Sequence, residues 1–386
     1  MLPRPVPASR AAKVFHLRLE LEGMNNLTEE LGCWMGSEQG NRTEVALPAM
    51  NALDNLASQH PSDVGVVVIG RNEGERLVRS LESVRRQADC VVYVDSGSTD
   101  GSVAAAQELA NAVVELDMRI PFTAARARNE GFQRLLEAGH DTRYVFFVDG
   151  DCEVVDGWLR TAVQFLDAHP DYCVVWGRRR EKFPERSIYN RLCDMEWQDY
   201  PLGETSACGG DAVARIEAIR QVGGFRADLI CGEEPEMCVR LRKAGWRIYH
   251  LETPMTLHDA AMYRFGQWWK RAVRAGYAFA QGAALHGAPP ERHAVRETWR
   301  AWIWGLALPL ATLCLVPLLG RWALLLLIAY PVQLVRLSAL RPRRSARDNW
   351  LRAAALLLGR FPEMLGQLKF HVDRFRRVQS GLIEYK

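Results

Sequence analysis

The sequence predicts an α/β fold, in which a mostly parallel sheet carries helices on both faces, followed by membrane helices. Between residues 62 and 151, apolar runs with the length of buried strands alternate with stretches at helical spacing, as in crossover βαβ units. The strand run Tyr144–Val148 ends in Asp149-Gly150-Asp151. Farther on, Ala301–Leu319 is a stretch of nineteen residues without a charge, which is long enough to cross a bilayer core.

Length and composition describe a globular chain and exclude some classes of protein. The chain has 386 residues, of which 48% are hydrophobic and 25% charged, and its net charge is +3. Because this charge is small, we expect no nucleic-acid partner. The nine cysteines form no C-x-x-C pair. We therefore expect reduced, mostly buried thiols rather than disulfides or a zinc site.

Residues 1–61 show no sustained hydrophobic period. We expect them to form a poorly ordered N-terminal extension, whose role the sequence does not indicate. The first ten residues are rich in proline and lack the apolar segment of a signal peptide.

The predicted sheet domain covers residues 62–295. Its first half alternates strands, rich in β-branched residues, with amphipathic helices. In chain order the expected elements are the strand Val64–Gly70, the helix Glu75–Gln87, the strand Cys90–Val94, the helix Val103–Ala110, the strand Ala112–Leu116, the helix Ala124–Gly139 and the strand Tyr144–Val148. Each connection is long enough for a crossover helix, so these strands are expected to run parallel.

The second half of the domain has a weaker pattern. Its expected elements are the helix Trp158–His169, the strand Tyr172–Trp176, the helices Ile216–Val222 and Met237–Ala244, and the strand Trp246–Leu251. Gly223 and Gly245 follow two of these helices, where helix ends favour glycine. Residues 177–203 are charged and aromatic without a period, and we expect them to be irregular.

The carboxylates Asp149 and Asp151 are costly to bury unless something pairs with them. A divalent cation is one explanation, because open α/β sheets bind ligands at the carboxyl ends of their strands and carboxylates suit Mg²⁺ or Mn²⁺. A turn with solvated acids explains the pair equally well when it is taken alone. The setting favours the cation, because Asp95 ends an earlier strand and the acids Glu233 and Glu234 follow later.

Two apolar stretches, Ala301–Leu319 and Trp322–Val335, are separated by Gly320-Arg321. We expect a transmembrane or membrane-inserted hairpin over residues 296–340, with a buried helical pair as the alternative. Residues 341–386 are basic and amphipathic, which predicts an interfacial tail. The arginines around the hairpin predict the inner (cytoplasmic) membrane, with the sheet domain facing the cytoplasm.

Five short motifs occur in order between Val64 and Arg274. They are Val66–Glu73, Asp95–Gly101, Ala127–Gly131, Asp149–Asp151 and Gly232–Glu234. Together they resemble family 2 glycosyltransferases of the GT-A fold, which has a Rossmann-like, mostly parallel sheet with helices on both faces. The resemblance implies transfer of a sugar from a nucleoside diphosphate sugar to an acceptor hydroxyl, with Mg²⁺ or Mn²⁺ as cofactor.

The resemblance also implies which residues bind the donor. Asp151, Asp149 and His258 would be the metal ligands, and a structural histidine is the equal alternative for His258. The nucleotide sugar would be bound by residues from several loops and one helix, namely Asn72, Glu73, Asp95, Arg128, Asp149, Gly209 and Gly210. For Arg128, a solvated or salt-bridged helix arginine is the alternative.

An acceptor hydroxyl is a poor nucleophile and needs a base within hydrogen-bond reach. The resemblance implies Glu234 as this base, with Glu233 as the second choice. Alternatively, these acids and Glu236 simply favour the N-terminus of the helix that follows. A single base with direct displacement implies inversion at the anomeric carbon.

The segment Gln267–Arg271 lies where processive members of the family carry Q-x-x-R-W, but its residue order departs from that motif. Two short apolar stretches also cannot build a polymer channel. We therefore expect a single addition to a lipid-linked or cell-envelope glycan acceptor. The basic, Trp-rich helix around this segment would seat a lipid-linked diphosphate, and ordinary packing of an amphipathic helix is the alternative.

Two rival functions remain at this stage. A sugar-phosphate nucleotidyltransferase uses a similar sheet, but Gly70–Gly74 is poorer in glycine and basic residues than its loop would require. A non-catalytic membrane scaffold on a decayed transferase domain is the other rival. The retained acids Asp149, Asp151 and Glu234, together with His258, argue against decay.

Overall fold

The computed structural model describes residues 63–139, 142–340, 344–378 and 381. All of them belong to one compact unit, residues 59–386. The predicted extension 1–61 lies outside the described residues.

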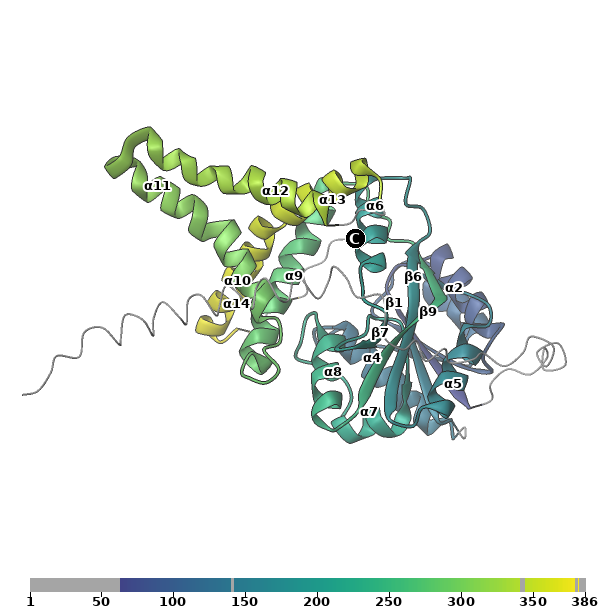
Figure 1. Cartoon of the computed structure of the whole chain (residues 1–386). Helices are drawn as coiled ribbons and strands as arrows, with labels where there is room; N and C mark the ends of the chain where they lie inside the picture. The colour runs from purple at the N-terminus through teal and green to yellow at the C-terminus, as the bar shows by residue number, and fades with distance from the viewer. Residues whose placement is uncertain (1–62, 140–141, 341–343, 379–380, 382–386) are drawn as a thin grey trace, which may run out of the picture. The chain divides into compact units, whose positions relative to one another are not determined.

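The described residues form one nine-stranded sheet. Its strands are β1 (Val64–Gly70), β2 (Cys90–Asp95), β3 (Ala112–Glu115), β4 (Tyr144–Asp149), β5 (Cys152–Val154), β6 (Tyr172–Glu181), β7 (Gly203–Thr205), β8 (Ala212–Arg215) and β9 (Arg247–His258). The strand order is β3-β2-β1-β4-β8-β6-β9-β5, and β7 pairs with β9 (Figure 1).

The strands that come first in the sequence, β1 to β4, run parallel to one another, as predicted. β1 pairs with β2 and β4, and β3 pairs with β2, all in parallel. The other half is mixed, because β8 runs antiparallel to both β4 and β6 while β6 and β9 run parallel. The short strands β5, β7 and β8 escaped prediction, since they lack the run of β-branched apolar residues that marked the equally short β3.

Helices flank the sheet and connect its strands (Figure 1). Those of the sheet domain are α2 (Glu75–Arg85), α3 (Ser102–Leu109), α4 (Ala124–Glu137), α5 (Trp158–Ala168), α6 (Ile188–Gln198), α7 (Ile216–Val222), α8 (Glu233–Lys243) and α9 (Phe265–His286). The predicted irregularity of residues 177–203 is wrong for the end of β6, which runs to Glu181, and for α6, where several polar residues pair with other elements. The predicted start of α8 at Met237 is also wrong, because the helix begins four residues earlier, after Gly232.

The core lies around the central strands. Val66, Val67 and Val68 of β1 and Val145 and Phe146 of β4 are fully buried, as expected for strands that are covered on both faces. Helices on the two faces of the sheet therefore hold the carboxyl ends of β1 and β4 in a rigid frame.

A long apolar segment follows the sheet domain. It comprises α10 (Val295–Trp302), a π-helical turn (Ile303–Ala307), α11 (Leu308–Leu319), a 3₁₀ segment (Gly320–Ile328) and α12 (Ala329–Ala339). Figure 1 shows α11 and α12 as two arms, and the backbone leaves helical geometry between them at Gly320 (φ 55°, ψ −141°). The hydroxyl of Tyr330 donates a hydrogen bond to the carbonyl of Trp304 across the arms.

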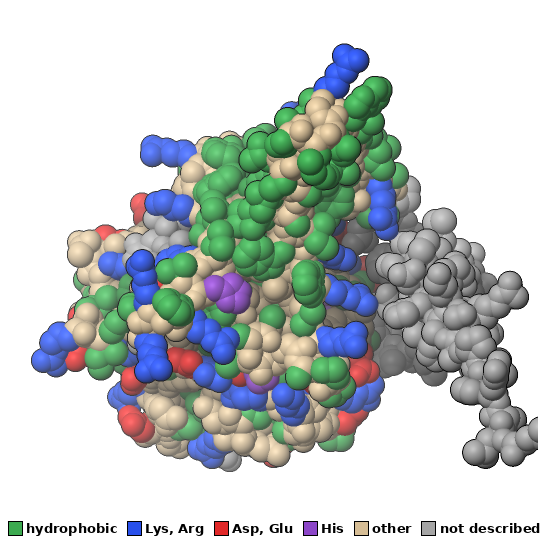
Figure 2. Space-filling model, turned by 90° about the vertical axis from the view of Figure 1, so that its left-hand side faces the viewer, with side chains coloured by type: hydrophobic (Ala, Val, Ile, Leu, Met, Phe, Trp, Pro, Cys, Tyr) green, Lys and Arg blue, Asp and Glu red, His purple; other side chains and the backbone are tan. Residues whose placement is uncertain are grey.

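The segment Val295–Ala339 is long and apolar enough to cross a membrane, with a mean hydropathy of 2.1 in its best window and 11% of that window buried. Leu318 is 79% and Trp322 65% exposed, and Figure 2 shows hydrophobic side chains covering this segment. The chain ends in two more helices, α13 (Ala346–Leu358) and α14 (Arg360–Arg376). α14 packs closely on α9, because the backbone of Glu363 lies against Gly276.

Candidate active site

The Asp-Gly-Asp turn lies at the carboxyl end of β4, beside the end of β1. The amide of Gly150 donates to the carbonyl of Ile69 over 2.8 Å, which ties the turn to β1. Asp149 remains 29% exposed, whereas Asp151 is 5% exposed. The two carboxylates therefore differ in environment, and they face different partners.

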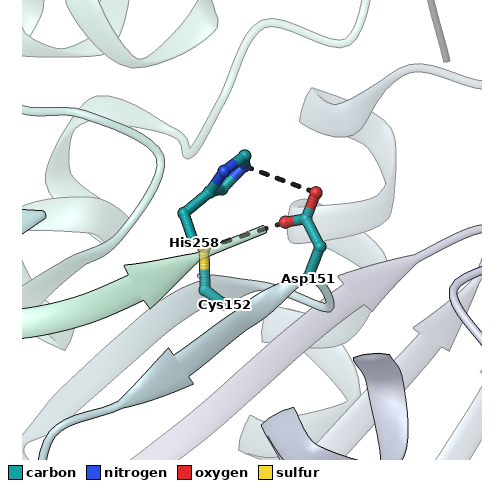
Figure 3. Close-up of side chains that lie close together, drawn as sticks. All are labelled: Asp151, Cys152 and His258. Carbon is teal, nitrogen blue, oxygen red and sulfur yellow. Dashed lines mark hydrogen bonds and ion pairs between the residues drawn. The ribbon is translucent and has the colours of Figure 1, made fainter. Parts of the chain in front are cut away.

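Asp151 faces His258 (Figure 3). Because β5 pairs with β9 so that Cys152 lies opposite His258, the residue before Cys152 comes next to the imidazole. The distance from His258 Nε2 to Asp151 Oδ2 is 3.3 Å, and the Cys152 thiol lies 3.7 Å from Asp151 Oδ1. The ligand atoms of these three residues all lie within 4.8 Å of one another.

Two of these three residues suit a divalent cation. Carboxylate oxygen and imidazole nitrogen are ligands for Mn²⁺, and carboxylate oxygen also suits Mg²⁺. Burial raises the pKa of the Cys152 thiol well above its usual range, so this residue stays a neutral thiol and a poor ligand for a hard cation. The residues present therefore fit a cation held by Asp151 and His258.

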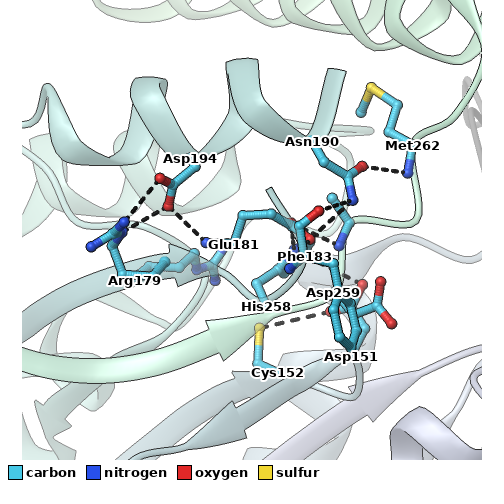
Figure 4. A network of polar contacts seen from close by, with 12 residues as sticks. Asp151, Cys152, Arg179, Glu181, Phe183, Asn190, Asp194, His258, Asp259 and Met262 are labelled. Atoms are coloured by element: carbon cyan, nitrogen blue, oxygen red, sulfur yellow. Dashed lines mark hydrogen bonds and ion pairs between the residues drawn. The ribbon is translucent and has the colours of Figure 1, made fainter. Parts of the chain in front are cut away.

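A polar network lies beside His258, on the Nδ1 side of its ring (Figure 4). The buried Glu181 lies 3.8 Å from His258 Nδ1 and accepts hydrogen bonds from the amide of Ala260 (3.1 Å) and from Asn190 Nδ2 (3.1 Å). Asn190 in turn accepts from the amide of Met262 over 3.0 Å. Sequence reasoning missed Glu181 and Asn190, because nothing in their local pattern places them beside a residue some seventy positions later.

A second cluster surrounds Arg128 of α4. Its guanidinium bridges three carboxylates, with Nη1 2.7 Å from Glu233, and Nη2 3.0 Å from Asp149 and 3.0 Å from Glu234. Arg128 is 2% exposed. Burial alone would lower its pKa, but Glu234, Asp149 and Glu233 together raise it above the ordinary arginine value. The salt-bridged alternative for Arg128 is thus the arrangement in this structure, with its partners at the site.

Glu234 has the electrostatics of a proton acceptor. Burial and the neighbouring Glu233 raise its pKa to about 7, against the opposing effect of Arg128. Both acids lie in the first turn of α8, so a favourable interaction with the helix N-terminus also applies to them. Glu236 is occupied elsewhere, by Arg240 and by His286 of α9.

Gly210 lies against this cluster. A Cβ atom on Gly210 would stand 2.9 Å from Arg128 Nη2, 3.0 Å from Asp149 Oδ2 and 3.2 Å from Glu234 Oε1, whereas one on Gly209 would meet nothing within 4 Å. A small cavity adjoins them, lined by Phe147, Val174, Cys208, Gly209, Gly210, Ala212, Ala214, Phe225, Glu234 and Met237. A side chain at this position would therefore displace the Arg128 guanidinium and crowd the two carboxylates.

Asp211 is a site residue that sequence reasoning missed. It is fully buried and accepts hydrogen bonds from Arg179 Nε (3.0 Å), Thr256 Oγ1 (2.7 Å) and the amide of Asp149 (3.2 Å). Its position directly after Gly209-Gly210 was the available signal. Through it, β6, β8 and β9 hold the end of β4 in place.

The predicted donor residues Asn72, Glu73 and Asp95 lie in two loops at the ends of β1 and β2. Asp95 accepts hydrogen bonds from the Tyr93 hydroxyl (2.9 Å) and from the amide of Ser98 (2.7 Å). Asn72 accepts from the amide of Thr99 over 2.7 Å, which joins the loops. Glu73 pairs with Arg76 at 2.7 Å. These side chains organise the loops beside the Asp-Gly-Asp turn.

Comparisons with known proteins find glycosyltransferases. Residues 65–223 match the family model described as glycosyl transferase family 2. The chain is 24% identical over 225 residues to glycosyltransferase AglE of Haloferax volcanii, which covers 55% of this chain and 71% of the relative. It is 27% identical over 243 residues to the pre-mycofactocin glycosyltransferase of Mycobacterium tuberculosis. This match covers 56% of this chain and 49% of the relative, so the chain spans about half of that relative's length.

A solved structure shares the fold. It is the mannosyltransferase PcManGT from Pyrobaculum calidifontis in complex with GDP-Man and Mn²⁺, with a TM-score of 0.50 and 22% identity. The similarity covers 80% of this chain and 88% of that chain. At this level of identity it shows the GT-A fold alone.

Removing the guanidinium tests the electrostatic role of Arg128. We expect Arg128→Met to lower the free energy of unfolding by about 3–5 kcal/mol at neutral pH, because three acids lose their shared cation. The loss should shrink as the pH falls, because burial and Glu233 raise the pKa of Glu234 to about 7 and its protonation then removes one of the three negative charges. Denaturant unfolding at several pH values measures both effects.

The matched control is Arg134→Met on the same helix, where the arginine is half-exposed and 4.0 Å from Glu137. This exposed pair should contribute less than about 0.5 kcal/mol. Equal unfolding midpoints for Arg128→Met and wild type would contradict the role assigned to Arg128.

Proposed function

We propose that this chain, whose residues 65–223 match the glycosyl transferase family 2 model, transfers a sugar from a nucleoside diphosphate sugar to an acceptor hydroxyl, with inversion at the anomeric carbon. The observation that carries this proposal is the cluster of Asp149, Arg128 and Glu234 around Gly210. It puts a carboxylate with a pKa of about 7 beside the carboxyl end of β4. Open α/β sheets bind their ligands at that end.

The proposed chemistry is one direct displacement. The acceptor oxygen forms a bond to the anomeric carbon while the bond from that carbon to the diphosphate oxygen breaks, and the diphosphate leaves with the electron pair. Glu234 takes the hydroxyl proton, because a base must lie on the face opposite the leaving group. Arg128 holds Glu234 and Asp149 in one orientation, and Glu233 is the second candidate for the base.

The donor side is assigned to the ends of β1, β2 and β4. Asp151 and His258 would hold Mg²⁺ or Mn²⁺, and Asp149 is a further candidate ligand. Such an ion offsets the negative charge that develops on the leaving diphosphate. The loops organised by Asn72 and Asp95 would receive the nucleoside.

The acceptor is assigned to the membrane side. The apolar segment Val295–Ala339 and the basic helices around it support membrane attachment, with the catalytic domain on the cytoplasmic face of the inner membrane. A membrane-attached enzyme meets lipid-linked or cell-envelope acceptors. One apolar segment is too little to enclose a growing polymer, which supports a single addition.

The two rival functions are less well supported. The family model is that of glycosyl transferases, and the loop at Gly70–Gly74 does not offer the basic, glycine-rich backbone of a nucleotidyltransferase. A decayed scaffold would have no need to keep Asp149, Glu234 and Arg128 in mutual contact.

The decisive experiment incubates the membrane fraction with Mn²⁺, acceptor lipid extract and a panel of nucleotide sugars, and measures nucleoside diphosphate release. We expect one donor to be turned over. Asp151→Ala should abolish transfer, and Glu234→Gln should lower it by about 10²–10⁴-fold, because it removes the base. The exposed acid of α7 provides the matched control, Glu217→Gln, which should retain activity. Wild-type rates in Glu234→Gln would assign the base to another residue.

The pH dependence of transfer follows from the raised pKa of Glu234. The base must be ionised, so kcat/KM should fall about tenfold per pH unit below pH 7 and level off above it. Arg128 lowers the pKa of Glu234, so Arg128→Met should move this acid limb to higher pH. A rate profile that stays flat down to pH 5 would be incompatible with Glu234 as the base.

Gly209 and Gly210 form a matched pair for testing the cluster. Gly210→Ala places a methyl group among Arg128, Asp149 and Glu234, and we expect a loss of transfer of about 100-fold from their displacement. Gly209→Ala fills open space and should stay near wild type. Steady-state rates of the two variants, with melting temperatures as a check on folding, give the comparison; equal rates would remove the cluster from the reaction.

A further inference from the structure

Helix α6 connects the metal-site histidine to the C-terminal tail. It is the helix that the sequence pattern did not predict, and most of its polar residues pair with other elements. Asp194 accepts from Arg180 and from the amide of Glu181, and Glu196 pairs with Arg271 of α9 at 2.7 Å. Each of these contacts joins α6 to a different part of the chain.

The end of α6 contacts His258 directly. The ring of Trp197 packs edge-on against the imidazole, with 4.8 Å between ring centroids, and the Arg179 guanidinium lies over the same indole at 5.6 Å. Asn190, one turn into α6, holds the amide of Met262 beyond His258. A shift of α6 would therefore move the imidazole of His258, which faces Asp151 at the proposed metal site.

Helix α13 and the residues just before it contact α6 and its C-cap residue Asp199 through two sets of ion pairs. Arg191 forms a bidentate pair with Asp348, with 2.9 Å between Nη2 and Oδ2. Asp199 forms ion pairs with Arg344, with 2.9 Å between Oδ1 and Nη2, and with Arg352. The side chains around Asp199 are less than one-fifth exposed, so salt screens these pairs less than pairs on an open surface.

Apolar packing reinforces the same contact. Ala355 of α13 packs against a buried cluster that α6, α9 and the segment after His258 share, namely Cys193, Trp197, Ala260, Met262 and Trp268. α13 thus contributes to the packing of this cluster. It follows the apolar segment Val295–Ala339 in the chain.

We propose that Arg191, Asp199 and Asp348 are positioning residues, through which α13 holds α6 and α6 holds His258. The order of the metal site then depends on the docking of the tail, and membrane attachment and catalysis are linked. This inference rests on the proposed function for its catalytic consequence. The competing explanation is that the ion pairs only stabilise the fold.

A charge exchange distinguishes the two explanations. In the full-length protein in detergent, Arg191→Asp and Asp348→Arg are each made alone and then together, with Arg347→Asp on the exposed side of α13 as the matched control. Hydrogen–deuterium exchange is followed in residues 188–198 and 258–262, and kcat and KM are measured with the donor that the wild type uses. Because the carboxylate of Asp348 also accepts a hydrogen bond from the hydroxyl of Ser345, the N-cap residue of α13, Arg191→Gln is a milder variant that leaves this helix unchanged.

We expect each single variant, Arg191→Gln included, to speed exchange in both segments by about tenfold. The same variants should lower kcat by about tenfold, because His258 is displaced, with KM little changed. The double variant should restore both, and Arg347→Asp should resemble wild type.

Faster exchange in 188–198 with unchanged exchange in 258–262 and unchanged kcat would overturn the proposal and leave the ion pairs a purely stabilising role. Absence of transfer by the wild type with every donor would instead count against the proposed function. In that case the exchange measurements still decide whether the tail positions His258.

Discussion

The buried guanidinium of Arg128 is the interaction on which the candidate site depends. Asp149, Glu233 and Glu234 come from two elements that are far apart in the chain, and three carboxylates so close together repel one another. The guanidinium stays protonated, and its positive charge offsets this repulsion. Even so, Glu234 keeps a raised pKa of about 7, because burial and Glu233 outweigh the guanidinium. The arrangement keeps the pKa of one acid near neutral pH, while the guanidinium holds the three carboxylates together.

The sheet explains why these groups meet. β1, β2 and β4 run parallel, so the loops that leave their carboxyl ends gather along one edge. α4 brings Arg128 to this edge, and the antiparallel β8 begins there, just after Gly210. The mixed half of the sheet adds Arg179 and Asp211 behind Asp149. β9 is long enough to carry His258 to Asp151. The groups that the proposed displacement needs at the leaving diphosphate and at the acceptor proton are therefore held along one edge of the sheet.

The C-terminal part of the chain adds contacts between the helices after the apolar segment and the sheet domain. An apolar segment with little burial is followed by a helix whose charged residues pair with α6. Partly buried ion pairs of this kind define a geometry more than they add stability. The same helix α6 contacts His258 through the ring of Trp197, which is the basis of the proposed coupling between the tail and the metal site.

Sequence reasoning went furthest where a local pattern carries the information. The buried strands β1, β2 and β4 follow from continuous β-branched runs, and α7 was predicted to the residue because a short apolar period ends at Gly223. Asp149 and Asp151 stood out because two acids directly after a buried strand need an explanation. The apolar segment was visible because its length alone defines it.

The sequence by itself therefore determined the α/β class, the parallel order of the first strands, the family resemblance and most of the candidate residues. Only the tertiary structure decided which of these residues meet. It separated Asp151 and His258 from the Arg128 cluster, turned Asp95 toward its own loop, and revealed Glu181, Asp211 and the whole of α6. The reason is physical: strand and helix periods are local and can be read along the chain, whereas a charge pair across the fold leaves no trace in the sequence near either partner.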